Sequence, residues 1–259
     1  MIDYFLNAGL LPGLVMLVVA TISYSLIVYL STFYIFKAHL QKKHEKIGRI
    51  LFRVTASLLA LILSISFANQ RVVFFNIQSS IEAEAAAIVD LKVDLDFFDT
   101  DEAHTIREEL INYIMHISND GWKSLEDDPF RSESFNKFLD IYSGIINLEA
   151  KTPVQERLKG NLLNDVDKLS DFLQVRLYTS RQKSSPLVYI SIIGLAISMI
   201  LFIVYPPDRI TIAFLSLYVA FIGIVLYFIL MMSNPLKGPL QIEPGPFLLL
   251  QETIESAVL

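Results

Sequence analysis

Four polar residues recur at seven-residue spacing along a largely apolar stretch of the chain: Ser57, Ser64, Arg71 and Gln78. Residues seven apart share one face of an α-helix, and that face drifts by only about 20° per heptad. A polar face on a membrane-crossing helix can line a path for ions at the axis of an oligomer. It can equally be a packing surface, because serine lets helices approach closely and arginine near a span end reaches the headgroups.

A second pattern continues from the first. Its residues alternate at four- and three-residue spacing: Ile77, Ile81, Glu84, Ile88, Leu91 and Leu95. This spacing is typical of a coiled-coil seam, here with a carboxylate at one seam position. A seam requires a partner helix, from the same chain or from a symmetry mate. The candidate pore-lining residues are therefore Ser57, Ser64, Arg71, Gln78 and Glu84, with Arg71 and Glu84 at the mouth.

Other reactive side chains do not form a recognisable catalytic or metal-binding pattern. His39 and His44 lie in a basic loop beside Glu45, but no third metal ligand is specified. The acidic residues lack the glycine and the spacing of a calcium loop. The chain has no cysteine, no glycine-rich phosphate loop and no nucleophile elbow. We therefore expect no enzyme activity, no metal site and no cofactor.

The elements that carry these residues are predicted to be membrane-spanning helices. The chain has 259 residues, of which 53% are hydrophobic, and the apolar residues are clustered. Spans of about 20 apolar residues cross a bilayer, and we expect them at 12–36, 50–77, 186–205 and 210–232. The predicted class is an all-α integral membrane protein with two transmembrane hairpins, 1–75 and 186–233. They bracket a helical insert, 76–185, and a C-terminal interfacial segment follows at 234–259.

The insert is expected to consist of helices throughout. No glycine lies between Gly48 and Gly121, so one helix is predicted from about residue 47 to 97, about 75 Å long. The next helix carries Asp99 and Glu102 as a capping box, with an apolar face at residues 103, 106, 110, 114 and 117. A third helix is expected to have Ser132 as its N-cap. The start of a fourth helix is predicted by Thr152, Pro153 and Gln155, and its apolar face runs from Val154 to Leu177.

Charge predicts the orientation of the chain. Residues 37–53 contain six basic residues and one acidic residue, which places this loop in the cytoplasm. The insert and both termini then face outward, and no cleavable signal peptide is expected. Residues 76–183 contain 21 acidic and 12 basic residues, a net charge of −9, so nucleic acid is an unsuitable partner. The expected partners are the lipid bilayer and further copies of the chain.

A closing motif follows the fourth span. Pro235, Gly238, Pro244, Pro246 and Phe247 appear in an order and spacing that resemble the end of bacterial bestrophin-like membrane proteins. Further similarities lie at Glu84-Ala85, Asp90-Leu91, Trp122, Thr152-Pro153, Leu169-Ser170-Asp171 and Arg176. The chain departs from the motif at Asn234, where the family usually has aspartate, and at Leu236, where it usually has an aromatic residue.

The resemblance implies two helix pairs around a helical insert. The name of the family compares it with bestrophins, which are pentameric anion channels with a cytosolic helical domain. The charge distribution places this insert outside, so either the expected orientation is wrong or the likeness to bestrophins is architectural only. Our hypothesis is an oligomeric channel of a bacterial plasma membrane that conducts inorganic ions passively along the polar face of the second span. The alternative is a membrane-anchored sensory or scaffold protein whose insert binds a partner or ligand.

Overall fold

The protein is an all-α membrane protein, as the sequence predicts. The computed structural model describes residues 9–39, 42–121, 133–180, 186–236 and 238–258. About 90% of the structure is helical, and no strand occurs in the described ranges. Four of the helices are long and apolar enough to cross a membrane. The chain forms two compact units, Met1–Phe74 with Lys183–Gln241 and Phe75–Gln182 with Ile242–Leu259.

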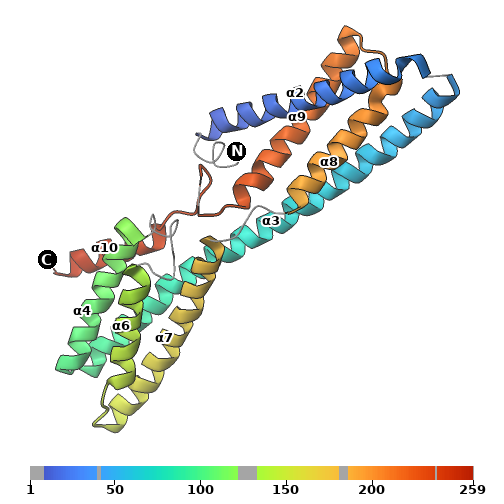
Figure 1. The fold of residues 1–259 in the computed structure, drawn as a ribbon. Coiled ribbons are helices and arrows are strands. Elements are labelled where there is room, and N and C mark those ends of the chain that lie inside the picture. Colours follow the sequence, from blue (N-terminus) through green and yellow to red (C-terminus); the bar gives the residue numbers. More distant parts are fainter. Residues whose placement is uncertain (1–8, 40–41, 122–132, 181–185, 237, 259) are drawn as a thin grey trace. The chain divides into compact units, whose positions relative to one another are not determined.

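The first unit, which we call the membrane unit, contains the four candidate spans (Figure 1). Its elements are α2 (Leu10–Phe36), the first part of α3 (Lys42–Phe98), α8 (Pro186–Leu201) with a 3₁₀ turn at Phe202–Val204, and α9 (Arg209–Met232). Helix α2 packs against both α9 and α8. The buried core of the membrane unit includes Tyr29, Leu59, Leu195 and Val219. Small residues allow this packing, since a Cβ on Gly223 would lie 3.2 Å from the Val18 Cα.

The second unit, which we call the insert unit, is a helical bundle (Figure 1). It combines the last part of α3 with α4 (Asp101–His116), a π-helix (Ile117–Gly121), α6 (Glu133–Asn147), α7 (Pro153–Ser180) and α10 (Gly245–Val258). Helix α6 packs on α4 and α7, while α10 packs on α4 and the π-helix. The C-terminal helix is therefore a part of the bundle, with helical neighbours. Its predicted place at the membrane interface stays a prediction.

The predicted seam on α3 is covered by the insert unit itself. All six of its residues are buried: Ile77, Ile81, Glu84, Ile88, Leu91 and Leu95. Contacts from α3 reach α4, where Arg107 Nη1 lies 3.0 Å from Asp96 Oδ1, and α7, where Gln155 Nε2 donates to the Phe98 carbonyl oxygen at 3.1 Å. Helices of the same chain thus supply the partner that the seam requires.

Two of the expected helix starts can be compared with the structure. Helix α7 begins at Pro153 as predicted, with the Thr152 hydroxyl accepting from the Gln155 amide at 3.2 Å. The predicted cap at Asp99 is wrong by one residue, because the Thr100 hydroxyl caps α4 by accepting from the Ala103 amide. Asp99 instead forms the corner before α4, with φ of 52°. The expected cap Ser132 and Trp122 lie outside the described residues.

Apolar faces of the insert helices are buried as the periodicity predicts, with one exception. On α4 the buried face comprises Ala103, Ile106, Leu110 and Ile114, and it continues to Ile117. On α7 it runs from Leu158 to Leu173. Val154 was expected on the same face, yet it is 63% exposed. It lies in the first turn of α7, one turn before the buried part of the helix begins.

Candidate functional site

The polar face of the second span lies on α3 and is open in the single chain. Ser57, Ser64 and Arg71 are all exposed on this helix. The Ser64 hydroxyl donates to the Ala60 carbonyl oxygen at 2.9 Å, which satisfies its proton within the helix. Its oxygen keeps lone pairs that can accept a further bond from the exposed side. The three residues therefore form a polar stripe, which we call the α3 stripe, that no other helix of the described chain buries.

A groove borders this stripe inside the membrane unit. It has a volume of about 470 Å³ and lies between α3 and α9. Its walls are mostly apolar and aromatic: Ala60, Leu63, Ser64, Phe67, Tyr218, Phe221, Ile222, Val225 and Phe228. Phe221 is 69% exposed, so the groove opens on the outer surface of the unit. Ser64 thus lies at the edge of an apolar recess that a lipid chain or a neighbouring helix could fill.

Gln78 and Glu84 have different surroundings from the α3 stripe. Gln78 is half-buried, and its side-chain nitrogen donates to Glu82 Oε1 at 3.2 Å on the same helix. Glu84 is fully buried, and the Tyr113 hydroxyl of α4 donates to its Oε1 at 3.2 Å. A buried carboxylate is costly unless it is hydrogen-bonded. The structure thus places Glu84 in the interior of the insert unit, bound to a helix of the same chain.

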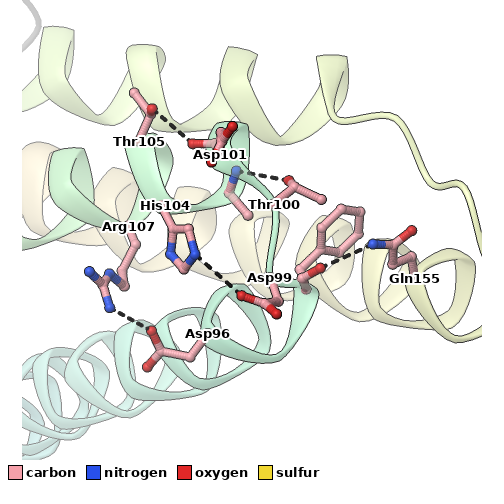
Figure 2. A network of polar contacts seen from close by, with 10 residues as sticks. Asp96, Asp99, Thr100, Asp101, His104, Thr105, Arg107 and Gln155 are labelled. Carbon is pink, nitrogen blue, oxygen red and sulfur yellow. Dashed lines mark hydrogen bonds and ion pairs between the residues drawn. The ribbon is translucent and has the colours of Figure 1, made fainter.

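The corner between α3 and α4 carries the densest set of polar contacts (Figure 2). Asp96 accepts from Lys92 Nζ at 2.9 Å and from Arg107 Nη1 at 3.0 Å, while His104 Nε2 lies 3.3 Å from Asp99 Oδ1. Burial alone would raise the pKa of Asp96, but the hydrogen bonds and positive charges of Lys92 and Arg107 hold it below its usual value. This network joins the end of α3 to the first turns of α4.

A second recess lies in the insert unit between α4 and α6. Its volume is about 410 Å³, and its polar walls include Glu102, Thr105, Glu109, Asp140, Ser143 and Asn147. Burial, and to a lesser degree the nearby charge of Asp140, raise the pKa of Glu109. Within the described residues, no group of three or more His, Asp or Glu side chains is arranged to hold a metal ion.

The closing motif has clear structural roles. Gly238 has φ of 89°, a conformation that favours glycine, and its carbonyl oxygen accepts from the Gln241 amide at 3.1 Å. Pro235 is buried. The Pro244 carbonyl oxygen accepts from the amides of Phe247 and Leu248 at 3.0 Å, which starts α10, and the Phe247 side chain is fully buried.

Asn234 explains one departure of this chain from the usual motif. Its side-chain nitrogen donates to the Leu230 carbonyl oxygen at 2.9 Å, where the backbone hydrogen bonds of α9 end. An ionised aspartate cannot donate such a bond. The amide at this position therefore satisfies a helix-end carbonyl, which is a structural role.

Sequence reasoning missed several residues of these sites. Tyr113 lies between Leu110 and Ile117 on the buried face of α4, so helical periodicity contained a signal for its position but none for its bond to Glu84. Tyr218 and Phe221 line the groove beside Ser64, and nothing in their sequence context distinguishes them from lipid-facing aromatic residues.

Comparison with known proteins agrees with this architecture. The family model of the bestrophin-like domain matches residues 19–247, which is most of the chain. No curated protein and no solved structure matches the chain. The matched region begins within the first candidate span and includes the other three spans, the insert and the closing motif up to the buried Phe247. This chain belongs to the bestrophin-like family of membrane proteins.

Proposed function

We propose that the protein is an oligomeric ion channel in which the α3 stripe of each copy faces a common axis. The observation that carries this proposal is the exposure of Ser57, Ser64 and Arg71 in the single chain. Polar and charged groups within a span rarely face lipid and instead face a bundle interior or a water-filled path. Further copies of the chain, arranged round α3, would provide such surroundings.

The coverage of the spans supports the same arrangement. In the most apolar 18-residue windows of the first and second spans only 17% of residues are buried, against 28% in the third span and 39% in the fourth. Helices α2 and α3 therefore both have a broad surface available for contact with other copies, and the groove beside Ser64 on α3 offers a recess for a neighbouring helix. In such an oligomer the serine hydroxyl oxygens would line the path, and Arg71 would place a positive charge along it. Glu84 has no role in this path, because Tyr113 binds it inside the insert unit.

The test is ion flux into liposomes from the purified protein, together with its mass in detergent. Ser64→Trp should abolish flux while the oligomer stays intact, because an indole would occupy the path. Leu58→Trp is the matched control, since Leu58 is 54% exposed on another face of the same helix. Equal loss of flux in both variants, or unchanged flux with Ser64→Trp, would remove the α3 stripe from the conduction path. Reversal potentials in asymmetric salt would then identify the sign of the ion.

The orientation that we propose places the basic turn between α2 and α3 in the cytoplasm of a bacterial cell. Its support is the charge of residues 37–53, with six basic residues and one acidic residue. The cysteine-free chain allows a direct test. Asn136→Cys introduces a thiol at an exposed position on α6 of the insert. An impermeant maleimide added outside intact cells should label it, and labelling only after the membrane is broken would reverse the orientation.

The alternative is a membrane-anchored sensor or scaffold without enzyme activity. The observation in its favour is the recess between α4 and α6, whose Glu102, Glu109 and Asp140 carboxylates suit a cationic ligand or partner. A monomeric protein that passes no ions at any voltage or salt concentration would favour this function. The carboxylate residues of this recess would then be the first residues to substitute.

A further inference from the structure

Helix α3 has a second regular face in the part that belongs to the insert unit. Its residues recur at three- and four-residue spacing and are all exposed in the single chain: Ser79, Glu82, Ala86, Val89, Val93 and Phe97. We call this face the outer seam. Val89 and Val93 are 40% and 43% exposed, and Phe97 is 72% exposed. The spacing is that of a coiled-coil contact, as it is in the buried seam of the same helix.

The outer seam lies on the side of α3 opposite the buried seam. From Ser79 to Val93, each of its residues precedes a residue of the buried seam by two positions, as Val89 precedes Leu91. Two positions turn an α-helix by about 200°, so the two seams face away from each other. Helices α4 and α7 cover only the buried seam. This part of α3 therefore has two opposite contact faces, and its own chain covers one of them.

The outer seam does not have the composition of a helix face that water covers. A solvated face typically carries many charged and polar residues, whereas the outer seam has one charged residue, Glu82. The one basic residue in 76–98 is Lys92, and its Nζ lies 2.9 Å from Asp96 Oδ2. A helix that is apolar on opposite sides belongs in the interior of an assembly. The spacing of the outer seam indicates that another helix covers it.

A second copy of this chain suits the outer seam better than an unrelated helix. Copies in one membrane share one orientation, so their α3 helices run parallel and the same residue of each copy can meet at a symmetry axis. Helix α3 is a single helix, Lys42–Phe98. Along it, Glu82 and Val89 follow Ser64 and Arg71 by eighteen residues each, which is about five helical turns. The outer seam therefore continues the direction of the α3 stripe along the helix.

We propose that the outer seams of neighbouring copies pack against one another, so that the insert units take part in the oligomer. This inference rests on the oligomer of the proposed function, but it does not depend on ion conduction. Val89, Val93 and Phe97 would lose their contact with water, which favours association. Glu82 would meet the Glu82 of the next copy. A single polar residue in a seam fixes the register of a coiled coil at a cost in stability.

Crosslinking of the full chain in its membrane tests this contact, because the chain has no cysteine of its own. The thiol of Val89→Cys should meet the same thiol of a neighbouring copy and form a covalent dimer on oxidation with copper phenanthroline. Val175→Cys is the matched control, since Val175 is 41% exposed on α7 of the same unit, outside the outer seam. This control should stay monomeric on a denaturing gel.

The stability of the oligomer in detergent gives a second measurement. Glu82→Leu should let the oligomer survive harsher detergent, because it removes like charges from the contact. Val89→Asp should dissociate the oligomer in milder detergent, and the control Val175→Asp should not. The reverse order of stability would contradict the outer seam.

The crosslinking results separate this inference from the proposed channel. A Val89→Cys dimer in a protein that passes no ions would support the outer seam and count against the channel. A conducting oligomer without a Val89→Cys dimer would keep the channel and overturn the outer seam. Equal dimer formation by Val89→Cys and Val175→Cys, or crosslinking of Val89→Cys to a different protein only, would also overturn it.

Discussion

The membrane unit and the insert unit satisfy their polar side chains in different ways. In the membrane unit seven serine and threonine hydroxyl groups donate to the carbonyl oxygen four residues earlier in the same helix: Thr21, Thr32, Thr55, Ser64, Ser66, Ser191 and Ser198. The hydroxyls of Tyr29 and Tyr227 donate to backbone carbonyl oxygens of other segments of that unit. In the insert unit, ion pairs and hydrogen bonds between two side chains also join different helices. Arg107 contacts Asp96 and Tyr142 donates to Asp167 Oδ1 at 3.2 Å, while the Gln155 side chain donates to the Phe98 carbonyl oxygen.

This difference follows from the solvent of each unit. A spanning helix must satisfy its polar groups internally, because the hydrocarbon offers no hydrogen bonds. Close approach of small residues then provides the contact between helices. In water the hydrophobic effect holds the helices together, and ion pairs and hydrogen bonds fix how they align. The two units should therefore be sensitive to different substitutions.

The largest expected effect is steric and lies in the membrane unit. A Cβ on Gly223 would lie 3.1 Å from Thr21 Oγ1 and 3.2 Å from the Val18 Cα, so Gly223→Leu must separate α2 from α9. We expect a loss of about 3 kcal/mol in the free energy of unfolding, at the upper end for overpacked cores. Thermal unfolding in detergent, followed by circular dichroism, measures it.

Gly160→Leu is the matched control for this substitution. Gly160 lies on the exposed side of α7, where nothing is within 4 Å of an added Cβ. Leucine is the better helix former, so stability should rise by roughly 0.5–1 kcal/mol. A loss of similar size in both variants would contradict the view that close helix approach distinguishes the membrane unit.

The next effect concerns a buried hydrogen bond in the insert unit. Tyr113→Phe removes the hydroxyl that donates to Glu84 Oε1, and both residues are fully buried. We expect the free energy of unfolding to fall by about 2 kcal/mol, because the carboxyl group keeps its desolvation cost and loses a hydrogen-bond donor. Hydrogen exchange of the α4 amides should accelerate. Tyr29→Phe, which removes a hydroxyl–carbonyl bond in the membrane unit, should cost only about 0.6 kcal/mol.

The fold was largely predictable because its signals are local. A run without glycine or proline predicts a long helix whatever surrounds it, and the predicted 47–97 became α3, Lys42–Phe98. The Thr152 hydroxyl caps α7 by accepting from the Gln155 amide, and the Gln155 side chain accepts from the Lys151 amide. The start of α4 was misplaced because Asp99 and Thr100 are adjacent residues that can both cap a helix, and aspartate is the more strongly preferred of the two types. Only the backbone, with Asp99 at positive φ, decides between them.

The candidate site was less predictable because it depends on which helix covers each face. Seven-residue spacing places Ser57, Ser64 and Arg71 on one side of a helix, but it does not say whether that side is covered. The same limitation applies to Glu84, a position of the four-three seam that was expected at the mouth of the path. Its bond to Tyr113 is a contact between residues 29 apart, and no local pattern encodes such a contact.

Asn234 offers a smaller test, at the C-terminal end of α9. Asn234→Asp restores the residue that is usual in the family motif but removes one of the two side-chain donors to the Leu230 carbonyl oxygen, and leaves the Ser233 hydroxyl as the other. It also places a negative charge at a helix C-terminus, where the helix dipole disfavours it. We expect a loss of about 1 kcal/mol, measured by thermal unfolding at neutral pH. Asn234→Gln keeps a donor and should recover part of the loss, whereas equal stability of all three chains would exclude the capping role.

The smallest effect is the pH dependence of the corner between α3 and α4. The pKa of Asp96 is lowered in the folded chain, so its contribution to stability is present above the unfolded pKa of about 3.9 and is lost as pH falls through the folded pKa. Its side chain is 36% exposed, and screening by solvent limits the contribution to less than about 1 kcal/mol. Asp96→Asn should therefore destabilise the chain slightly at pH 7, and the difference should shrink as the pH is lowered through the folded pKa, in melts of the two proteins side by side.

Glu109, in the same unit, should change stability with pH in the opposite direction to Asp96. Burial and Asp140 raise its pKa, so its protonated form is favoured in the folded chain and its contribution to stability grows as pH falls through the folded pKa. Glu109→Gln should therefore stabilise the chain slightly at pH 7, and this gain should vanish in acid. The two carboxyl groups lie on neighbouring helices of one bundle, and only Asp96 has cations beside it. Parallel pH profiles for the two variants would show that those ion pairs do not set the pH response of the insert unit.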